Sequence, residues 1–229
     1  MNMIHKSALV EKLAAGDGEL ELINRYSLRP LKAEEVFIFR LAACNNQVDR
    51  DHEHFTDAAL EGFAKLFPGK PALIDHLWSA KTQTARIYAA EVESDGDVKR
   101  LMLRCYMPRL ETNADVIAAI ESGILRECSV GVSVASAVCD ICGTELTSGW
   151  CEHLRGKEYN GKLCTVSLDK AVDAYEVSFV AVPAQPEAGV TKSKRYGGPE
   201  EPPAPPEDGE REKLARAMQA QAEKRYGGI

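Results

Sequence analysis

The feature that most constrains the fold of this chain is a pair of β-type runs joined by a tight turn. Residues 84–93 and 98–107 are rich in aliphatic, aromatic and β-branched side chains, and Ser94-Asp95-Gly96-Asp97 connects them. An Asp-Gly pair between two such runs is a strong signal for a β-hairpin. The centre of the chain is therefore expected to form an antiparallel sheet.

The segments on either side of this hairpin predict further strands and two amphipathic helices. One helix, at residues 57–67, has Thr56 as its N-cap. The other follows Thr112 or Asn113 and stops at Gly123, and its apolar stripe is Val116, Ile117, Ile120 and Ile124. Strands are expected at residues 36–44, 72–74, 128–134, 165–168 and 174–182. The pattern predicts an α+β domain over residues 34–190, a closed or partly open β-barrel of about six or seven strands with flanking helices.

The N-terminal part of the chain has a different character. Residues 1–33 are polar and mixed in charge, and they are expected to form a flexible arm. A short helix is predicted around residues 7–15, and Gly16-Asp17-Gly18 would end it.

The C-terminal part, residues 191–229, is predicted to be a tail outside the domain. Residues 199–208 are acidic and rich in proline, which is typical of an extended linker, and residues 210–225 form a weak helical segment. Lys-Arg-Tyr-Gly-Gly occurs at residues 194–198 and again at residues 224–228. Exposed segments that contain glycine are good protease substrates, so both copies are hypothetical self-processing sites.

The composition limits the class of protein. Of the 229 residues, 45% are hydrophobic, enough for a domain with its own core. A net charge of −7 and the lack of a Lys/Arg block argue against specific binding to nucleic acid. The longest apolar runs, such as residues 177–184, are too short to cross a bilayer, and the N-terminus lacks a secretory pattern. We therefore expect a soluble intracellular protein with no membrane partner.

Residues 128–134 alternate between two kinds of side chain, as a half-buried strand does. One face carries Cys128, Val130, Val132 and Val134, and the other carries Ser129, Gly131 and Ser133. A hydroxyl among such small neighbours leaves room for a peptide, and a backbone N–H near Gly131 is a candidate donor to an oxyanion. Ser129 is therefore a candidate nucleophile, and the alternative is that these serines are merely solvated.

A serine nucleophile requires an imidazole base and an acceptor that orients the imidazole. Of the five histidines, His76 follows a short apolar run and precedes Leu77-Trp78, which makes it the candidate base. Glu176 is the candidate acceptor, because a carboxylate within an apolar strand needs a polar partner. Asp75 and Asp173 are the alternatives for this third role.

Alternation also predicts which way the side chains around Glu176 point. Glu176 and Ser178 would share one face of their strand, and the apolar side chains of Tyr175, Val177 and Phe179 would share the other.

Four of the seven cysteines fall in one short segment. Two pairs, Cys139-x2-Cys142 and Cys151-x-His153, supply four ligands at a spacing typical of structural zinc. Cys164 is an alternative fourth ligand. With every position filled by protein, the zinc would stabilise residues 138–164 as a loop inserted between two strands and would not be the catalyst.

The order of these motifs resembles that of the tailed-phage prohead (capsid maturation) proteases. The order is Asp49-x-Asp51, Asp75-His76, the hairpin, a helix ending at Gly123, Ser129-Val130-Gly131 and Tyr175-Glu176-Val177-Ser178-Phe179-Val180-Ala181-Val182-Pro183-Ala184. The last string, of the form Glu-x-Ser-x-Val-x-x-Pro-Ala, is the most specific signature. The resemblance implies that His76 is the general base, Ser129 the nucleophile and Glu176 the third member, on a fold similar to the herpesvirus assemblins.

The resemblance also implies a function. A protein of this family is a serine endopeptidase that cleaves scaffold and coat-protein segments inside the assembling prohead, in the host cytoplasm, and a homo-oligomer is expected. Two other classes remain open. One is a metal-dependent hydrolase whose ion is held by Asp49, Asp51, His52, His54 and His76. The other is a non-catalytic capsid assembly or scaffold module.

Overall fold

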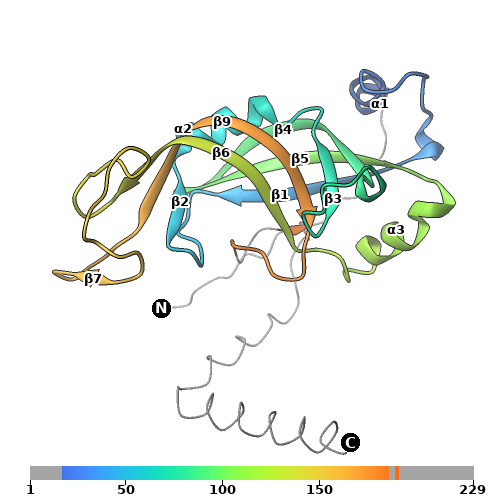
Figure 1. Ribbon diagram of the computed structural model, residues 1–229. Helices are drawn as coiled ribbons and strands as arrows, with labels where there is room; N and C mark the ends of the chain where they lie inside the picture. The colour runs from blue at the N-terminus through green and yellow to red at the C-terminus, as the bar shows by residue number, and fades with distance from the viewer. Residues whose placement is uncertain (1–16, 186–188, 191–229) are drawn as a thin grey trace, which may run out of the picture. The chain divides into compact units, whose positions relative to one another are not determined.

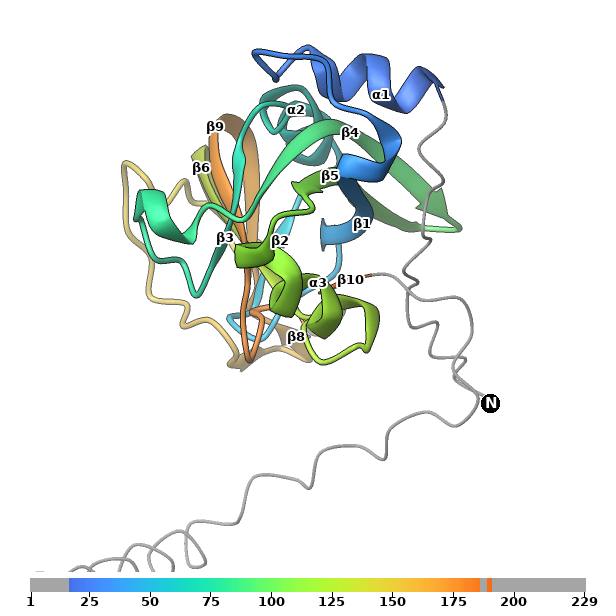
Figure 2. The same ribbon diagram turned by 90° about the vertical axis from the view of Figure 1, so that its right-hand side faces the viewer.

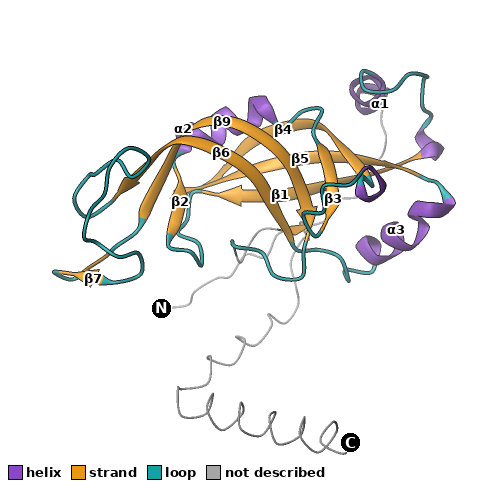
Figure 3. Ribbon diagram, viewed as in Figure 1, coloured by secondary structure: helices purple, strands orange, loops and turns teal. Residues whose placement is uncertain are grey.

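One large sheet dominates the fold (Figure 1). The computed structural model describes residues 17–185 and 189–190. The strands are β1 (Val36–Asn45), β2 (Glu53–Phe55), β3 (Pro71–Ile74), β4 (Ala85–Asp95), β5 (Val98–Pro108), β6 (Cys128–Cys139), β7 (Glu158–Tyr159), β8 (Lys162–Leu163), β9 (Val166–Phe179) and β10 (Gly189–Val190). The helices are α1 (Asp17–Asn24), α2 (Asp57–Leu66) and α3 (Ala114–Glu121), with 3₁₀ turns η1 (Ala33–Glu35), η2 (Ala80–Thr82) and η3 (Glu111–Asn113). The predicted α+β class is confirmed, because sheet prevails over a few short helices (Figure 3).

Strand β9 is the strand with which β2, β3 and β6 all pair. The strands β10, β1, β5, β4, β3, β9 and β2 follow one another across the sheet, and β6 pairs with β9. β2 lies parallel to the beginning of β9, and β3 lies parallel to its end. β6 runs antiparallel to β9 along the whole of its own length. In Figure 1 these two strands form a long curved ribbon across the front of the molecule.

The sheet does not close into a barrel over the described residues. β6 comes near β1, where Cys128 Sγ lies 3.6 Å from Ala42 O. No backbone ladder within the described residues joins β6 to β1 or β10, however. The closed form of the predicted barrel is therefore wrong, and the likeness to assemblins remains a prediction. Closure depends on strand tilt and stagger, and neither can be read from alternation along one strand.

The predicted hairpin and the first predicted helix are confirmed. β4 and β5 pair antiparallel with Asp95 opposite Val98, and Gly96 has a φ of +63° in the turn. Thr56 caps α2, because its Oγ1 accepts a hydrogen bond of 3.1 Å from the N–H of Ala59. α2 packs against β9, β5 and β4 (Figure 2), and its Phe63 is fully buried.

The second predicted helix, α3, is also present, but its apolar stripe is shorter than expected. Ile117 and Ile120 are buried, and Gly123 has a φ of +76° just beyond the helix. Ile124 is 75% exposed, because the chain turns at Gly123 and leaves the helical path before it. The prediction that Ile124 extends the stripe is therefore wrong.

The end of the predicted arm is held against the domain. Asp17–Asn24 form α1, which begins where Gly16-Asp17-Gly18 was expected to end a helix, and Ile23 is fully buried. Glu19 accepts hydrogen bonds from Tyr88 and from Arg104, the latter at 2.6 Å. The prediction of a flexible arm therefore fails for its described end.

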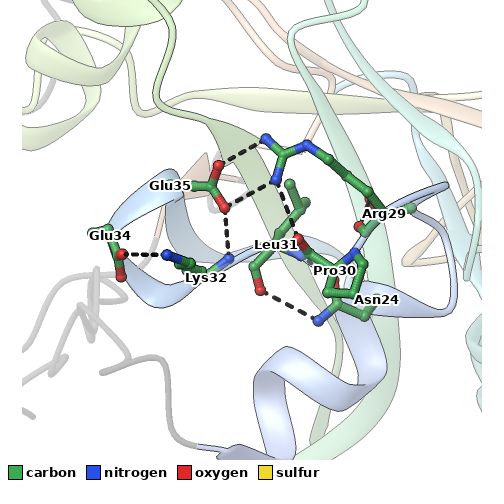
Figure 4. Close-up of polar contacts among 8 residues, drawn as sticks. Asn24, Arg29, Pro30, Leu31, Lys32, Glu34 and Glu35 are labelled. Carbon is green, nitrogen blue, oxygen red and sulfur yellow. Dashed lines mark hydrogen bonds and ion pairs between the residues drawn. The ribbon is translucent and has the colours of Figure 1, made fainter.

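The link between α1 and β1 is also fixed by local hydrogen bonds (Figure 4). Arg29 pairs with both carboxylate oxygens of Glu35, at 2.7 and 3.1 Å. The Asn24 side chain accepts from the N–H of Leu31 and donates to its carbonyl, at 2.7 and 3.3 Å. The helix predicted at residues 7–15 and the tail at 191–229, with both Lys-Arg-Tyr-Gly-Gly segments, lie outside the described residues.

The two strands predicted at residues 165–168 and 174–182 form the single strand β9. Its polar middle is accommodated by irregularities in the ladder with β6, and Lys170 has a φ of +58° there. Within the described residues, none of the helices combines the length and the apolar character that a membrane crossing requires.

Candidate active site

Two faces of β6 separate the core from the candidate site, as the alternation predicted. Cys128 is buried, and Val130, Val132 and Val134 pack against the main core. Ser129 and Gly131 point to the other face, where Ser129 lies opposite Ser178 and Gly131 lies opposite Glu176 on β9. Partners in a ladder point the same way, so these four residues share one patch of the sheet.

His76 reaches this patch from the turn that follows β3. Ile74 lies beside Phe179 at the end of β9, and the N–H of Asp75 donates to Phe179 O at 3.0 Å. Asp75 and His76 both have a φ of +53°, a conformation that non-glycine residues adopt at a cost in free energy and that often occurs at functional sites. His76 Nδ1 lies 2.7 Å from Glu176 Oε1.

The burial of the two partners differs sharply. The Glu176 side chain is 1% exposed, whereas the His76 side chain is 40% exposed. A buried carboxylate needs hydrogen-bond partners to offset the cost of its burial, and Glu176 has two of them, His76 and one further group. Glu176 therefore holds the His76 ring through Nδ1, and the other ring nitrogen, Nε2, makes no bond with Glu176.

Ser178 is a member of the site for which the sequence analysis assigned no role. Its Oγ is fully buried, accepts from the backbone N–H of His76 at 3.1 Å and donates to Glu176 Oε2 at 2.5 Å. The hydroxyl thus holds both the turn that carries the imidazole and the carboxylate that orients it. The signal was present in the sequence, because the spacing Glu-x-Ser places both side chains on one face of a strand.

Gly131 makes room for the Glu176 carboxylate. A Cβ at position 131 would overlap Glu176 Oε1 and would lie 3.3 Å from Cδ. The glycine is therefore required by the carboxylate, a role that the sequence analysis did not assign to it.

The backbone N–H of Gly131 is not the group that could meet an oxyanion. The N–H of Val180 donates to Glu127 O at 3.1 Å, and hydrogen-bonded pairs alternate with open pairs in an antiparallel ladder. Ser129 and Gly131 therefore belong to hydrogen-bonded pairs and direct their N–H groups to β9. The N–H groups of Val130 and Val132 point away from β9, so the oxyanion donor expected near Gly131 would have to be one of these.

Replacing Gly131 with Ala is expected to displace the Glu176 carboxylate and with it the His76 ring. A misplacement of about 1 Å costs on the order of 10²-fold in rate, so the reaction of Ser129 with a fluorophosphonate should slow by about that factor. Gly18→Ala is the matched control, because a Cβ at Gly18 meets nothing within 4 Å. An unchanged rate in Gly131→Ala would show that the carboxylate position does not matter.

The other candidates for the third role are not bonded to the ring. Asp173 accepts from Lys70 Nζ at 3.1 Å and from the N–H of Ala174 at 2.8 Å. Asp75 is exposed and makes no side-chain hydrogen bond with His76 among the described residues. Ser129 is half-buried, and its hydroxyl makes no hydrogen bond with His76 within the described part of the chain. Such bonds are often formed only when the substrate binds.

The second set of histidines lies elsewhere. His54 Nε2 is 3.1 Å from Asp140 Oδ2 and 3.1 Å from Ser167 Oγ, next to the beginning of β9. His76 lies at the opposite end of that strand. Asp49 Oδ1 accepts from the N–H groups of Asp51 and Glu53 and so closes its own turn. The ligand set Asp49, Asp51, His52, His54 and His76 is thus not brought together in the described residues, where the one group that could hold a metal lies elsewhere.

That group is the predicted cysteine cluster. One ligand atom from each of Cys139, Cys142, Cys151 and His153 lies within 4.8 Å of the other three. His153 Nδ1 is buried and has no hydrogen-bond partner in the described residues, as expected for a nitrogen that a metal would occupy. A hydrogen bond from Thr144 lowers the pKa of the Cys142 thiol to about 6, which favours the thiolate that metals bind.

Cys164 lies next to this cluster without belonging to it. Its Sγ is 4.0 Å from Cys139 Sγ. Burial raises the pKa of the Cys164 thiol to about 11. The cluster lies at the end of β6 that is opposite to Ser129, among the loops around β7 and β8 (Figure 1).

Comparisons of this chain with models of protein families, with curated proteins and with solved structures found no match.

Proposed function

We propose that this protein is a serine endopeptidase of the prohead protease type. Ser129 would attack the scissile carbonyl, and His76 Nε2 would take the hydroxyl proton and later return it to the leaving amine. Glu176 would hold the ring by Nδ1 and stabilise the imidazolium. The N–H of Val130, which follows the nucleophile and points away from β9, is the proposed donor to the oxyanion.

The observation that carries this proposal is the hydrogen bond of 2.7 Å between His76 Nδ1 and the buried Glu176, on the same face of the sheet as Ser129. A buried acid that binds Nδ1 selects the tautomer in which Nε2 can act as a base. The choice of scaffold and coat-protein segments as substrates, the location inside a prohead and the homo-oligomeric state rest on the resemblance of the motifs alone.

A fluorophosphonate probe tests the proposal directly. We expect the intact protein to form a covalent adduct that peptide mapping assigns to Ser129, and to process co-expressed scaffold or coat protein. Ser129→Ala should lose both reactions, because no other group can replace the nucleophile. Its circular dichroism spectrum should be unchanged.

The matched control is Ser94→Ala, which changes an exposed serine of β4 and should react like the unmodified protein. Processing that persists in Ser129→Ala, or an adduct on another serine, would refute the assignment.

We also propose that the ion bound by Cys139, Cys142, Cys151 and His153 is zinc with a structural role. Three thiolates and one imidazole are a set that zinc prefers, and they leave no open position for a substrate. The ion would hold the loop between β6 and β9 in place and would take no part in the reaction.

A further inference from the structure

Two aromatic side chains lie beside the candidate active site and are not part of the proposed triad. Trp78 follows His76 by two residues and is 73% exposed. Its ring contacts that of Tyr175, with centroids 5.9 Å apart and planes at 56°. Tyr175 directly precedes Glu176 on β9. Each ring is therefore attached to a segment that also carries a proposed catalytic side chain.

An irregularity in β9 turns Tyr175 toward the Ser129 face of the sheet. Glu176 pairs with Gly131 and Ala174 pairs with Val132, so Tyr175 is an extra residue in the ladder. Regular alternation would place Tyr175 with the buried Val177, yet Tyr175 is 39% exposed. Such bulges re-aim side chains and are common next to active sites.

A hydrogen bond confirms which face Tyr175 occupies. Its hydroxyl donates to Ser133 Oγ at 3.2 Å, and Ser133 is on the same side of β6 as Ser129. The interpretation that Tyr175 shares a face with the core residues is therefore wrong. The bond also fixes the tyrosine ring, against which Trp78 packs, so the pair forms a preformed aromatic surface.

For an endopeptidase, the distance along β6 from Ser129 to the aromatic pair determines which substrate residue can reach this surface. Ser133 is four residues from Ser129, which corresponds to about 13 Å along a strand. A substrate peptide in extended form advances by about 3.3 to 3.6 Å per residue, so four of its residues span about the same distance. The aromatic pair is thus within reach of a substrate residue about four positions from the scissile bond.

The surroundings of the pair favour an apolar occupant. Leu77, between His76 and Trp78, is 55% exposed. Asp173 is already paired with Lys70 at 3.1 Å, and Glu176 is buried against His76. Both of these carboxylates already have partners, whereas the two aromatic faces and Leu77 offer apolar contact area.

We infer, on the basis of the proposed function, that Trp78 and Tyr175 form a subsite for a large apolar or aromatic side chain of the peptide substrate. This subsite would select the substrate segment rather than take part in the chemistry. It predicts a preference at one position within about four residues of the cleaved bond.

The test uses the full-length protein and a peptide library made by digesting a bacterial proteome. We expect the cleavage sites, identified by mass spectrometry, to be enriched in Phe, Tyr, Trp, Leu or Met at that position. Trp78→Ala should lose about tenfold or more in kcat/KM for the enriched peptides, since an apolar subsite is worth roughly that factor. The reaction of Ser129 with a small fluorophosphonate should fall far less, because the probe does not reach the subsite.

Trp150→Ala is the matched control, because Trp150 is the other tryptophan of the chain, is 79% exposed and lies in the loop between β6 and β9. It should keep both the enrichment and the rate. Cleavage without any apolar preference, a preference for basic side chains, or equal losses of labelling and cleavage in Trp78→Ala would overturn the subsite and leave the proposed function intact. A protein that neither reacts at Ser129 nor cleaves peptides would overturn both.

Discussion

Glu176→Gln is expected to slow the reaction of Ser129 with a fluorophosphonate, and peptide cleavage, by about 10³- to 10⁴-fold while the fold is retained. Glu and Gln have nearly the same shape, so the buried side chain still fits. Burial of Glu176 is nearly complete, and its partners His76 and Ser178 decide how an amide would be oriented there.

Ser178 determines that orientation. Its hydroxyl accepts from the N–H of His76 and therefore has its single hydrogen left for residue 176. In the Gln variant this hydrogen must meet the amide oxygen, so the amide NH₂ faces His76 Nδ1. A donor at that place forces Nδ1 to be the acceptor and moves the ring proton to Nε2. The imidazole then cannot take the proton of Ser129.

Asp173→Asn is the control, since Asp173 lies on the same strand, was an alternative for the third role and is bonded to Lys70 instead. We expect this variant to react at nearly the normal rate. Thermal unfolding of both variants separates loss of chemistry from loss of fold. A normal rate for Glu176→Gln together with a large loss for Asp173→Asn would reverse the assignment.

The sequence predicted those parts of the site that depend on one strand or one short segment. Alternation in β6 placed Ser129 away from the core valines because the extra residues in this ladder lie on β9 and not on β6. The four residues of the cysteine cluster were also identified, since close spacing limits how they can be arranged. Both predictions needed only local geometry.

What could not be predicted depends on how separate strands are aligned. The role of Gly131 follows from its position opposite Glu176, and no pattern within β6 reveals that partner. Tyr175 was assigned to the wrong face because an extra residue in a ladder leaves the local alternation of residue types unchanged. His54 likewise has its partner Asp140 in a distant segment.

Helix α1 also depends on contacts with residues that are distant in the sequence. Gly16-Asp17-Gly18 has the composition of a helix end, yet Asp17 begins α1. A helix of this length gains its stability from packing, here through the buried Ile23 and through Glu19, which binds Tyr88 and Arg104. Sequence propensity alone does not contain those contacts.

Replacing one ligand of the proposed zinc site is expected to abolish zinc binding. The protein purified without chelators should contain about one zinc ion per chain, and Cys139→Ser or Cys151→Ser should contain almost none, since a closed site that loses one thiolate binds zinc far more weakly. Metal content is measured by mass spectrometry of the elements. Hydrogen exchange should rise strongly in residues 140–163, because the ion would stabilise this loop by several kcal/mol.

The effect should remain local. Cys139 and Ser129 are at opposite ends of β6, about 30 Å apart along a strand of that length, so the reaction of Ser129 with a fluorophosphonate should continue in the metal-free variants.

Cys164→Ser provides the sharpest comparison, because Cys164 Sγ lies only 4.0 Å from Cys139 Sγ and yet is not among the four mutually close ligands. We expect this variant to keep its zinc and His153→Ala to lose it. The reverse result would make Cys164 the fourth ligand in place of His153, and a wild-type protein without bound metal would remove the proposed zinc site altogether. Loss of Ser129 reactivity together with the zinc would instead show that the ion supports the active site along β6, against the structural role proposed for it.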